Sequence, residues 1–177
     1  MAKKLTSAYP KLALLTASWL DTPLGQMLAI ANDEALYLLE FGDQKGLERK
    51  LERLRTKATI IPGSTKPIRS IEHELALYFE GKLSEFKTPL FLSGTPFQIS
   101  VWNELKKIPW GKTKSYADIA HAIQKPKGYR AVAQANGANP VAIIVPCHRV
   151  INESGELGGY SGGIWRKQWL LDHEKCP

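Results

Sequence analysis

The first 41 residues carry short apolar runs separated by turn-forming residues. The runs are LALLTASW (12–19), QMLAIA (26–31) and ALYLLEF (35–41), with a TPLG turn and an NDE turn between them. Apolar runs of this length, bounded by such residues, are typical of β-strands. The pattern therefore predicts an antiparallel meander over residues 11–41.

Helical spacing replaces the strand pattern after residue 44. Leucines recur every three or four positions among charges in KGLERKLERLRTK (45–57), which predicts an amphipathic helix over one face of the sheet. A short ATII run (58–61) ends at a Pro-Gly pair, and IRSIEHELALYFEG (68–81) returns to helical spacing before its final glycine. The first half is therefore predicted to be a small α/β unit, and no residue in it suggests catalysis.

A second domain is predicted to begin near Gly94, where glycine frees the backbone and a new helix starts at once. Thr95 and Gln98 have the spacing of a capping box, with a proline at the first helical position between them. We therefore predict two domains, residues 1–92 and residues 93–177.

Two short helices joined by a basic loop follow in this second domain. Ser115 is predicted to cap the first helix, with Asp118 in the box position and apolar residues along one face. The loop QKPKG (124–128) leads to a helix over residues 129–136, which an Asn-Gly pair ending at Gly137 is expected to terminate in the left-handed conformation. This arrangement predicts a helix-turn-helix.

The second of these helices, in YRAVAQANGAN, is built largely of alanine. Small side chains let a helix approach another helix or a nucleic-acid groove, and alanine is also simply the best helix former. Arg130 stands in the first turn, where the helix dipole disfavours a positive charge. We therefore expect Arg130 to be needed by an outside partner.

Composition is that of an ordinary globular protein with an excess of positive charge. The 177 residues are 44% hydrophobic, and 24 Lys and Arg against 17 Asp and Glu give a net charge of +7. A polyanionic partner would explain this charge, and so would a solvated basic surface. The charge alone leaves both interpretations open.

Two cysteines, Cys147 and Cys176, are too few for a disulfide framework and fit a reducing compartment, which we take to be the cytoplasm. The four histidines are scattered without the paired spacing of a zinc site, so we predict no metal. The N-terminal stretch has a short apolar run interrupted at Pro10, which predicts a flexible tail and not a signal peptide. No run approaches the roughly 20 apolar residues of a membrane span.

The stretch IIVPCHRV places a cysteine, a histidine and an arginine in succession behind a proline. Residues 141–145 form a continuous apolar run, which predicts a buried strand or extended segment that delivers Cys147 into the domain interior. A buried cysteine is often an inert apolar residue. A nucleophilic thiol needs a base or a nearby positive charge, and His148 and Arg149 could supply these.

The way in which His148 could serve Cys147 depends on the backbone. Neighbouring residues of an extended chain point to opposite faces, so His148 can act only if the chain turns at Pro146 or a water relays the proton. Glu174 shares a helical stripe with Lys167 and two leucines, which predicts that it faces inward. A buried carboxylate needs a partner, and His148 would provide one, as in a catalytic triad.

Two glycine pairs, at residues 158–159 and 162–163, flank Tyr160 and Ser161. Such a segment is either a flexible surface loop or a backbone folded close to a ligand, with N–H groups free to bind it. Its continuity with the Cys147 segment favours the ligand.

Six motifs, in order over residues 95–174, resemble the O6-alkylguanine-DNA alkyltransferases. They are TPFQ with VW, the SY pair, YRAVAQANGANP, PCHRV, GYSGG and WLLDHE. The first half resembles that family's N-terminal domain more loosely, chiefly in TPLG and the strand pattern. The resemblance implies an α/β N-terminal domain with a small antiparallel-rich, ribonuclease H-like sheet, and a mostly helical C-terminal domain with a winged-helix-like helix-turn-helix.

The resemblance also implies irreversible, single-turnover DNA repair by a monomer without a cofactor. The alkyl group would pass from O6 of a damaged guanine in duplex DNA to the protein, with O4-methylthymine as a second substrate to be tested. The implied reacting residues are Cys147 as acceptor, His148 as its base through a water, Glu174 as orienter, Asn139 as brace of the turn, and Tyr116 as proton donor to the base. The implied binding residues are Ser161, Tyr160 and the main chain of Cys147 and Val150 at the base, Arg130 as the finger that enters the stack, and Ser115, Ala131 and Gly137 along the DNA. Some members hold zinc in the N-terminal domain, but this chain has no cysteine before Cys147.

Three other functions are weighed against this one. A non-catalytic sensor of alkylated DNA would share the motifs but replace the cysteine, typically with tryptophan, so Cys147 argues against it. A thiol hydrolase that uses Cys147, His148 and Glu174 would leave the helix-turn-helix and Arg130 without a task. A transcription regulator would need base-reading side chains, which the alanine-rich helix lacks.

Overall fold

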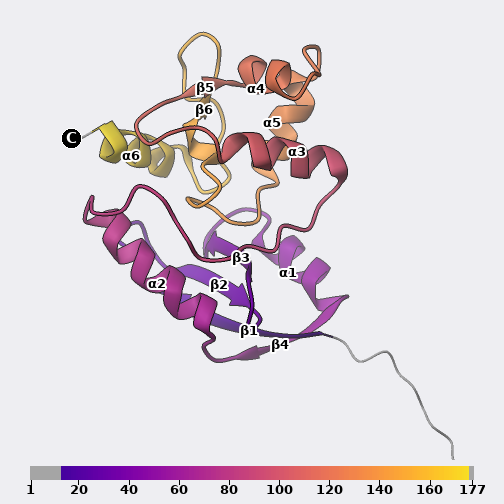
Figure 1. Cartoon of the computed structure of the whole chain (residues 1–177), viewed down its shortest axis with the longest axis vertical. Helices are drawn as coiled ribbons and strands as arrows, with labels where there is room; N and C mark the ends of the chain where they lie inside the picture. The colour runs from indigo at the N-terminus through magenta and orange to yellow at the C-terminus, as the bar shows by residue number, and fades with distance from the viewer. Residues whose placement is uncertain (1–12, 176–177) are drawn as a thin grey trace, which may run out of the picture.

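The computed structural model describes residues 13–175 of the chain (Figure 1). The N-terminal tail predicted from the sequence and Cys176 lie outside these residues. Figure 1 shows a sheet flanked by helices in one half of the molecule and a mainly helical second half stacked on it. Among residues 13–175, no helix combines the length and the apolar content needed to cross a membrane.

The sheet of the first half contains the predicted meander. Strands β1 (Ala13–Leu20), β2 (Met27–Ala31) and β3 (Leu36–Phe41) pair antiparallel in sequence order. Strand β4 (Ala58–Pro62) corresponds to the ATII run and pairs parallel with β1, which gives the sheet order β3-β2-β1-β4. The sheet is therefore mixed, with its single parallel pair at one edge.

Helices cover both faces of this sheet because its central strands are apolar on both sides. The leucines of α1 (Leu47–Arg55) pack on one face, against residues such as Leu28 and Ile30. Helix α2 (Lys66–Phe79) packs on the other face, where Met27 and its neighbours belong to an apolar cluster that continues into the second half. The second half therefore rests directly on the sheet face that α2 partly covers.

The second half contains the predicted helix-turn-helix. Its elements are α3 (Pro96–Leu105), β5 (Lys114–Ser115), α4 (Tyr116–Ala122), α5 (Tyr129–Gly137), the 3-10 turn η1 (Cys147–Arg149), β6 (Val150–Ile151) and α6 (Ile164–Lys175). Both predicted capping boxes are present, one joining Thr95 and Gln98 and the other joining Ser115 and Asp118. Helices α4 and α5 pack together at the end of the molecule remote from the sheet (Figure 1).

Two local predictions were wrong. Residues 141–145 do not form a strand, since only Val141 makes a β-bridge, to Leu39, and Ile143 turns the chain with φ of 71°. Gly137 does not end α5 in the left-handed conformation but is its last helical residue, and the Ala138 N–H still donates to the Gln134 carbonyl at 3.0 Å. In the 141–145 segment tertiary hydrogen bonds replace the strand signal, whereas at Gly137 the helical hydrogen-bond pattern continues one residue further than predicted.

Candidate active site

A buried turn, and not a strand, carries Cys147 into the interior. The Leu39 N–H donates to the Pro140 carbonyl at 2.9 Å, and the Ala142 N–H donates to the Leu39 carbonyl at 2.8 Å, so strand β3 fixes the start of the turn. The chain then bends at Pro146, with φ of −80° and ψ of 62°, and Cys147 opens the 3-10 turn. The backbone does turn at Pro146, but the turn leaves His148 without a hydrogen bond to the Cys147 Sγ, so the second possibility, a water relay, stays a prediction.

Asn139 holds this turn together from inside. Its side-chain Nδ2 donates to the Val145 carbonyl at 2.8 Å and lies 3.2 Å from the Cys147 Sγ, while its Oδ1 accepts from the Val141 N–H at 3.0 Å. The Asn139 carbonyl in turn accepts from Lys50 Nζ of α1 at 2.7 Å. No local pattern could have predicted this link between the two halves of the chain, since 89 residues separate the partners.

Burial dominates the acid–base behaviour of the thiol. Cys147 is 4% exposed, and burial raises the pKa of its thiol to about 11, against a partial lowering by the hydrogen bond from Asn139. A thiol with this pKa keeps its proton at neutral pH, so a reaction at sulfur requires a base nearby.

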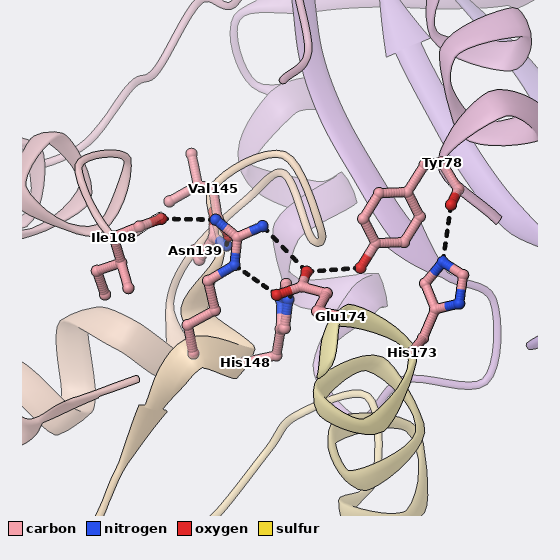
Figure 2. A network of polar contacts seen from close by, with 8 residues as sticks. Tyr78, Ile108, Asn139, Val145, His148, His173 and Glu174 are labelled. Carbon is pink, nitrogen blue, oxygen red and sulfur yellow. Dashed lines mark hydrogen bonds and ion pairs between the residues drawn. The ribbon is translucent and has the colours of Figure 1, made fainter. Parts of the chain in front are cut away.

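Glu174 is the centre of a buried network (Figure 2). Its carboxylate accepts from His148 Nε2 at 2.7 Å, from Arg149 Nε at 2.7 Å and Nη2 at 3.0 Å, and from the Tyr78 hydroxyl at 2.8 Å. Burial alone would raise the pKa of Glu174, but the hydrogen bonds from His148 and Arg149 outweigh it and lower the pKa to about 2. The inward stripe predicted on the last helix is confirmed, because Lys167, Leu170, Leu171 and Glu174 are all buried.

The charge on Glu174 decides the tautomer of His148. Burial lowers the pKa of His148, so the ring is neutral, and an ionised carboxylate can only accept. The proton therefore lies on Nε2, toward Glu174, and Nδ1 keeps a free lone pair. That Nδ1 is buried without a hydrogen-bond partner among the described residues, as a base awaiting a proton would be.

Arg149 does not act on the thiol, although the sequence left that open. Its guanidinium binds Glu174, and its Nη1 donates to the Ile108 carbonyl at 2.6 Å. Arg149 therefore keeps Glu174 ionised and ties α6 to the segment after α3. Tyr78 of α2 contributes the remaining bond, and only its place on the apolar face of α2 could have indicated that it points into the core.

Lys167 connects the cysteine segment to the glycine-rich loop. Its Nζ donates to the Val150 carbonyl at 2.6 Å and to the Gly159 carbonyl at 3.3 Å. Burial lowers the pKa of Lys167 to about 8, with Cys147 acting in the opposite direction. The sequence indicated that Lys167 faces inward, but not that it joins these two carbonyls.

A cavity of about 470 Å³ opens beside the thiol. Cys147 is among its lining residues, which otherwise come from α4, α5, the residue after β6 and the glycine-rich loop: Tyr116, Tyr129, Arg130, Ala133, Asn136, Gly137, Asn152, Gly159, Tyr160 and Ser161. The volume lies within the roughly 300–1,000 Å³ of small-molecule sites. Burial raises the pKa of Tyr116, followed by the proximity of Cys147, and it raises that of Tyr160 further, so both phenols stay protonated.

Not every predicted site residue lines this cavity. His148, Glu174 and Asn139 lie buried behind it, and the Val150 carbonyl is held by Lys167. Ser115 uses its hydroxyl to accept the Asp118 N–H at 3.0 Å, and Ala131 is exposed on the outer surface of α5. The structure therefore brings together Cys147, Tyr116, Arg130, Gly137, Tyr160 and Ser161 around one cavity, and sets Ser115 and Ala131 outside it.

Among residues 13–175, no cluster of histidine, cysteine, aspartate or glutamate side chains has the arrangement of a metal site.

Replacing Asn139 with alanine is expected to loosen the turn that carries the thiol. The change leaves the Val145 carbonyl and the Val141 N–H without their partner, which costs about 1–3 kcal/mol of unfolding free energy. Urea unfolding would measure the loss, and the rate of Cys147 modification by iodoacetamide would report the turn. Gln134→Ala, at an exposed position of α5, is the matched control, and equal stability of the two variants would contradict the role of Asn139.

Fold and site together define a protein with a mixed-sheet domain and a helix-turn-helix domain, which carries a buried cysteine in the wall of a cavity. Residues 15–92 match the family described as 6-O-methylguanine DNA methyltransferase, ribonuclease-like domain, and residues 96–176 match 6-O-methylguanine DNA methyltransferase, DNA binding domain. The chain belongs to the 6-O-methylguanine DNA methyltransferase family.

Relatives of known name cover nearly the whole chain. The methylated-DNA--protein-cysteine methyltransferase of Mycobacterium tuberculosis is 46% identical over 156 residues, which is 88% of this chain and 90% of that protein. Its namesake from Methanosarcina barkeri is 42% identical over 156 residues, 88% of this chain and 94% of that protein. The crystal structure of Mycobacterium tuberculosis OGT in complex with DNA is similar with a TM-score of 0.78 and 42% identity, covering 92% of this chain and 93% of that one.

Proposed function

We propose that this protein repairs O6-methylguanine in DNA by moving the methyl group onto Cys147. The observation that carries the proposal is the buried thiol in the wall of a cavity large enough for a base, between the helix-turn-helix and the glycine-rich loop. Family membership, and relatives that are methylated-DNA--protein-cysteine methyltransferases, support the same reaction.

The chemistry is a displacement at the methyl carbon. Sγ forms a bond to that carbon while the bond from carbon to O6 breaks, and its electron pair stays on the guanine. The thiol proton passes to His148 Nδ1, and because His148 makes no hydrogen bond to Sγ, a bridging water carries it. The thioether product has no return path, so each molecule reacts once and no cofactor is consumed.

Glu174 and Tyr116 assist the two proton transfers of this step. Glu174 stabilises the imidazolium that forms on His148, as the third member of a triad does. Tyr116 donates a proton to the departing guanine and regains one from solvent, to which His148 returns the thiol proton. The raised pKa of Tyr116 keeps the phenol protonated before the reaction and makes it a weaker acid, so the negative charge left on the departing guanine has to draw the proton.

The cavity wall is proposed to recognise the damaged base. Ser161 would hydrogen-bond O6, and Tyr160 would line the apolar side of the ring. The carbonyls of Cys147 and Val150 would accept from the exocyclic amine, and a carbonyl oxygen has a second lone pair beside the one that Lys167 occupies on Val150. Lys167 is thus proposed to hold this carbonyl in place. O4-methylthymine has no exocyclic amine, so we propose its repair as the weaker activity.

The DNA partner is proposed to be a duplex from which the damaged nucleotide is flipped. The reacting atom lies inside the stack, so the base must leave it and the gap must be filled. Arg130 at the mouth of the cavity is proposed to fill it, while Ala131 and Gly137 let α5 approach the groove and Ser115 lies along the backbone.

We further propose that the domains divide at residues 92 and 93, supported by family matches that end at residue 92 and resume at residue 96. The protein would act as a monomer, since thiol, base and DNA-binding helices all come from one chain. We place it in the cytoplasm because the thiol has to stay reduced.

The test is stoichiometric transfer. Mixed with duplex DNA that contains one O6-methylguanine, the protein should gain the mass of one methyl group, on the peptide that contains Cys147, while the DNA is restored. Unmodified protein by intact-mass spectrometry, together with unrepaired DNA, would contradict the proposal. Release of product over many turnovers from an ester or peptide would instead indicate a thiol hydrolase.

Replacing Arg130 with alanine is expected to lower two rate constants, one for repair of duplex DNA and one for reaction with the free modified base. The factor lost on the duplex should be roughly ten times the factor lost on the free base. Only the duplex has to be unstacked, which costs a few kcal/mol. Single-turnover rate constants on both substrates measure the difference, with Arg130→Lys as the variant that keeps the charge. Equal losses on the two substrates would contradict the finger role.

A further inference from the structure

Tyr129 is an exposed aromatic residue beside the cavity that the proposed mechanism does not use. It is the first residue of α5, and 47% of its surface is exposed. Its hydroxyl makes no hydrogen bond to any residue from 13 to 175, and its ring lies outside the apolar clusters of that region. The position therefore does not serve the fold of the described chain.

No other large apolar side chain of α5 is exposed beside Tyr129. The other exposed residues of α5 are Arg130, Ala131, Ala133, Gln134 and Gly137. Tyr129 and Arg130 both line the cavity, and the Arg130 guanidinium lies 5.7 Å from the centre of the Tyr129 ring. The Tyr129 ring thus lies next to Arg130, the proposed finger, and no other aromatic side chain of α5 is exposed.

Charge identifies the kind of partner that this surface fits. Lys125 and Lys127 in the preceding loop are exposed, and with Arg130 they place three cations within six residues. None of the three forms an ion pair within residues 13–175. Unpaired cations around an exposed aromatic ring match a nucleic acid, whose phosphates take the charges and whose bases take the ring.

We propose that Tyr129 is a stacking residue for DNA, which packs against a base next to the flipped nucleotide while Arg130 fills the gap. The inference rests on the proposed function and adds a second contact to it. Flipping exposes the faces of the neighbouring bases, and an aromatic ring covers such a face whatever the base, because every base has a π-face. A protein that must act wherever damage occurs would thereby bind DNA more tightly without recognising its sequence.

The test compares Tyr129→Ala with Tyr129→Phe on duplex DNA and on the free modified base. Base–aromatic stacking supports a roughly tenfold fall in the duplex rate constant relative to the free-base rate constant for Tyr129→Ala. Phenylalanine keeps the ring and should keep the wild-type ratio. Gln134→Ala, exposed on the same helix, should also keep it.

A fluorescent base reports the contact directly. In a Cys147→Ser background, which binds without reacting, 2-aminopurine placed beside the lesion should be quenched by wild-type Tyr129 and by phenylalanine, and should brighten with alanine. An unchanged duplex rate for Tyr129→Ala, or equal losses on duplex and free base, would overturn the stacking role. If the parent protein fails to repair the duplex at all, the proposed function falls first, and these outcomes keep the two apart.

Discussion

Cys147→Ala is expected to abolish methyl transfer completely while DNA binding persists. The sulfur is the proposed methyl acceptor. The remaining polar side chains of the cavity wall are the phenols of Tyr116, Tyr129 and Tyr160, the hydroxyl of Ser161, the guanidinium of Arg130 and the amides of Asn136 and Asn152, and none of them is a nucleophile comparable to a thiol. The phenols of Tyr116 and Tyr160 have a raised pKa and stay protonated. Alanine occupies less volume than cysteine, so the turn held by Asn139 has room for it.

The measurement combines intact mass with DNA binding. Cys147→Ala mixed with methylated duplex should show no mass gain, and a gel-shift titration should give a Kd close to that of the parent protein. Cys176→Ala is the matched control, because it removes the other cysteine of the chain and should react normally. Loss of DNA binding in Cys147→Ala together with loss of the thermal transition would mean that the cysteine is structural.

Glu174→Ala is expected to destabilise the fold and slow the reaction together. The change leaves Arg149 and Tyr78 buried without their acceptor, and removing one partner of a buried ion pair costs about 3–5 kcal/mol of unfolding free energy. It also frees the His148 ring to take the other tautomer, with its proton on the nitrogen that should accept one. Urea unfolding measures the loss of stability. Single-turnover rate constants, determined under conditions in which the variant is fully folded, measure the slower reaction.

Glu174→Gln separates these effects, and Glu153→Gln, at an exposed position, is the control. Glutamine keeps the shape of the side chain but can no longer stabilise an imidazolium by its charge. The single-turnover rate constant should therefore fall further than the loss of unfolding free energy by itself would explain. A wild-type rate in folded Glu174→Gln would contradict the role of Glu174 in orienting and charging His148.

The network also predicts the response to acid. The pKa of Glu174 is lowered from 4.5 to about 2 in the folded protein, so the unfolded chain takes up the proton first as the pH falls. Its contribution to stability is therefore complete above about pH 4.5 and is lost as the pH falls toward 2. The lowered pKa of His148 acts in the same direction below its ordinary value of 6.5. Glu174→Gln should flatten the acid limb of the stability curve, and an unchanged curve would contradict this assignment.

Much of the fold could be predicted because the signals are local. The two capping boxes need only a side chain and an N–H three residues away, and both formed as predicted. The meander and the inward-facing Glu174 follow from the two-residue period of strands and the three-to-four-residue period of helices. The residues proposed to react, Cys147 and His148, could also be named from the sequence, since they follow each other in a segment that lies next to a predicted helix-turn-helix.

The sequence by itself determined most of the elements and the helix-turn-helix, since each depends on residues close in the chain, and it made Cys147 the candidate acceptor. Only the tertiary structure decided the shape of the 141–145 segment, because its apolar residues suit a buried turn as well as a strand, and strand β3 offers it a single bridge at Val141. It also decided that Tyr78, Arg149 and Lys167 complete the site. Buried polar groups must find partners wherever the fold brings them, and the Tyr78 hydroxyl finds its partner, Glu174, 96 residues away along the chain.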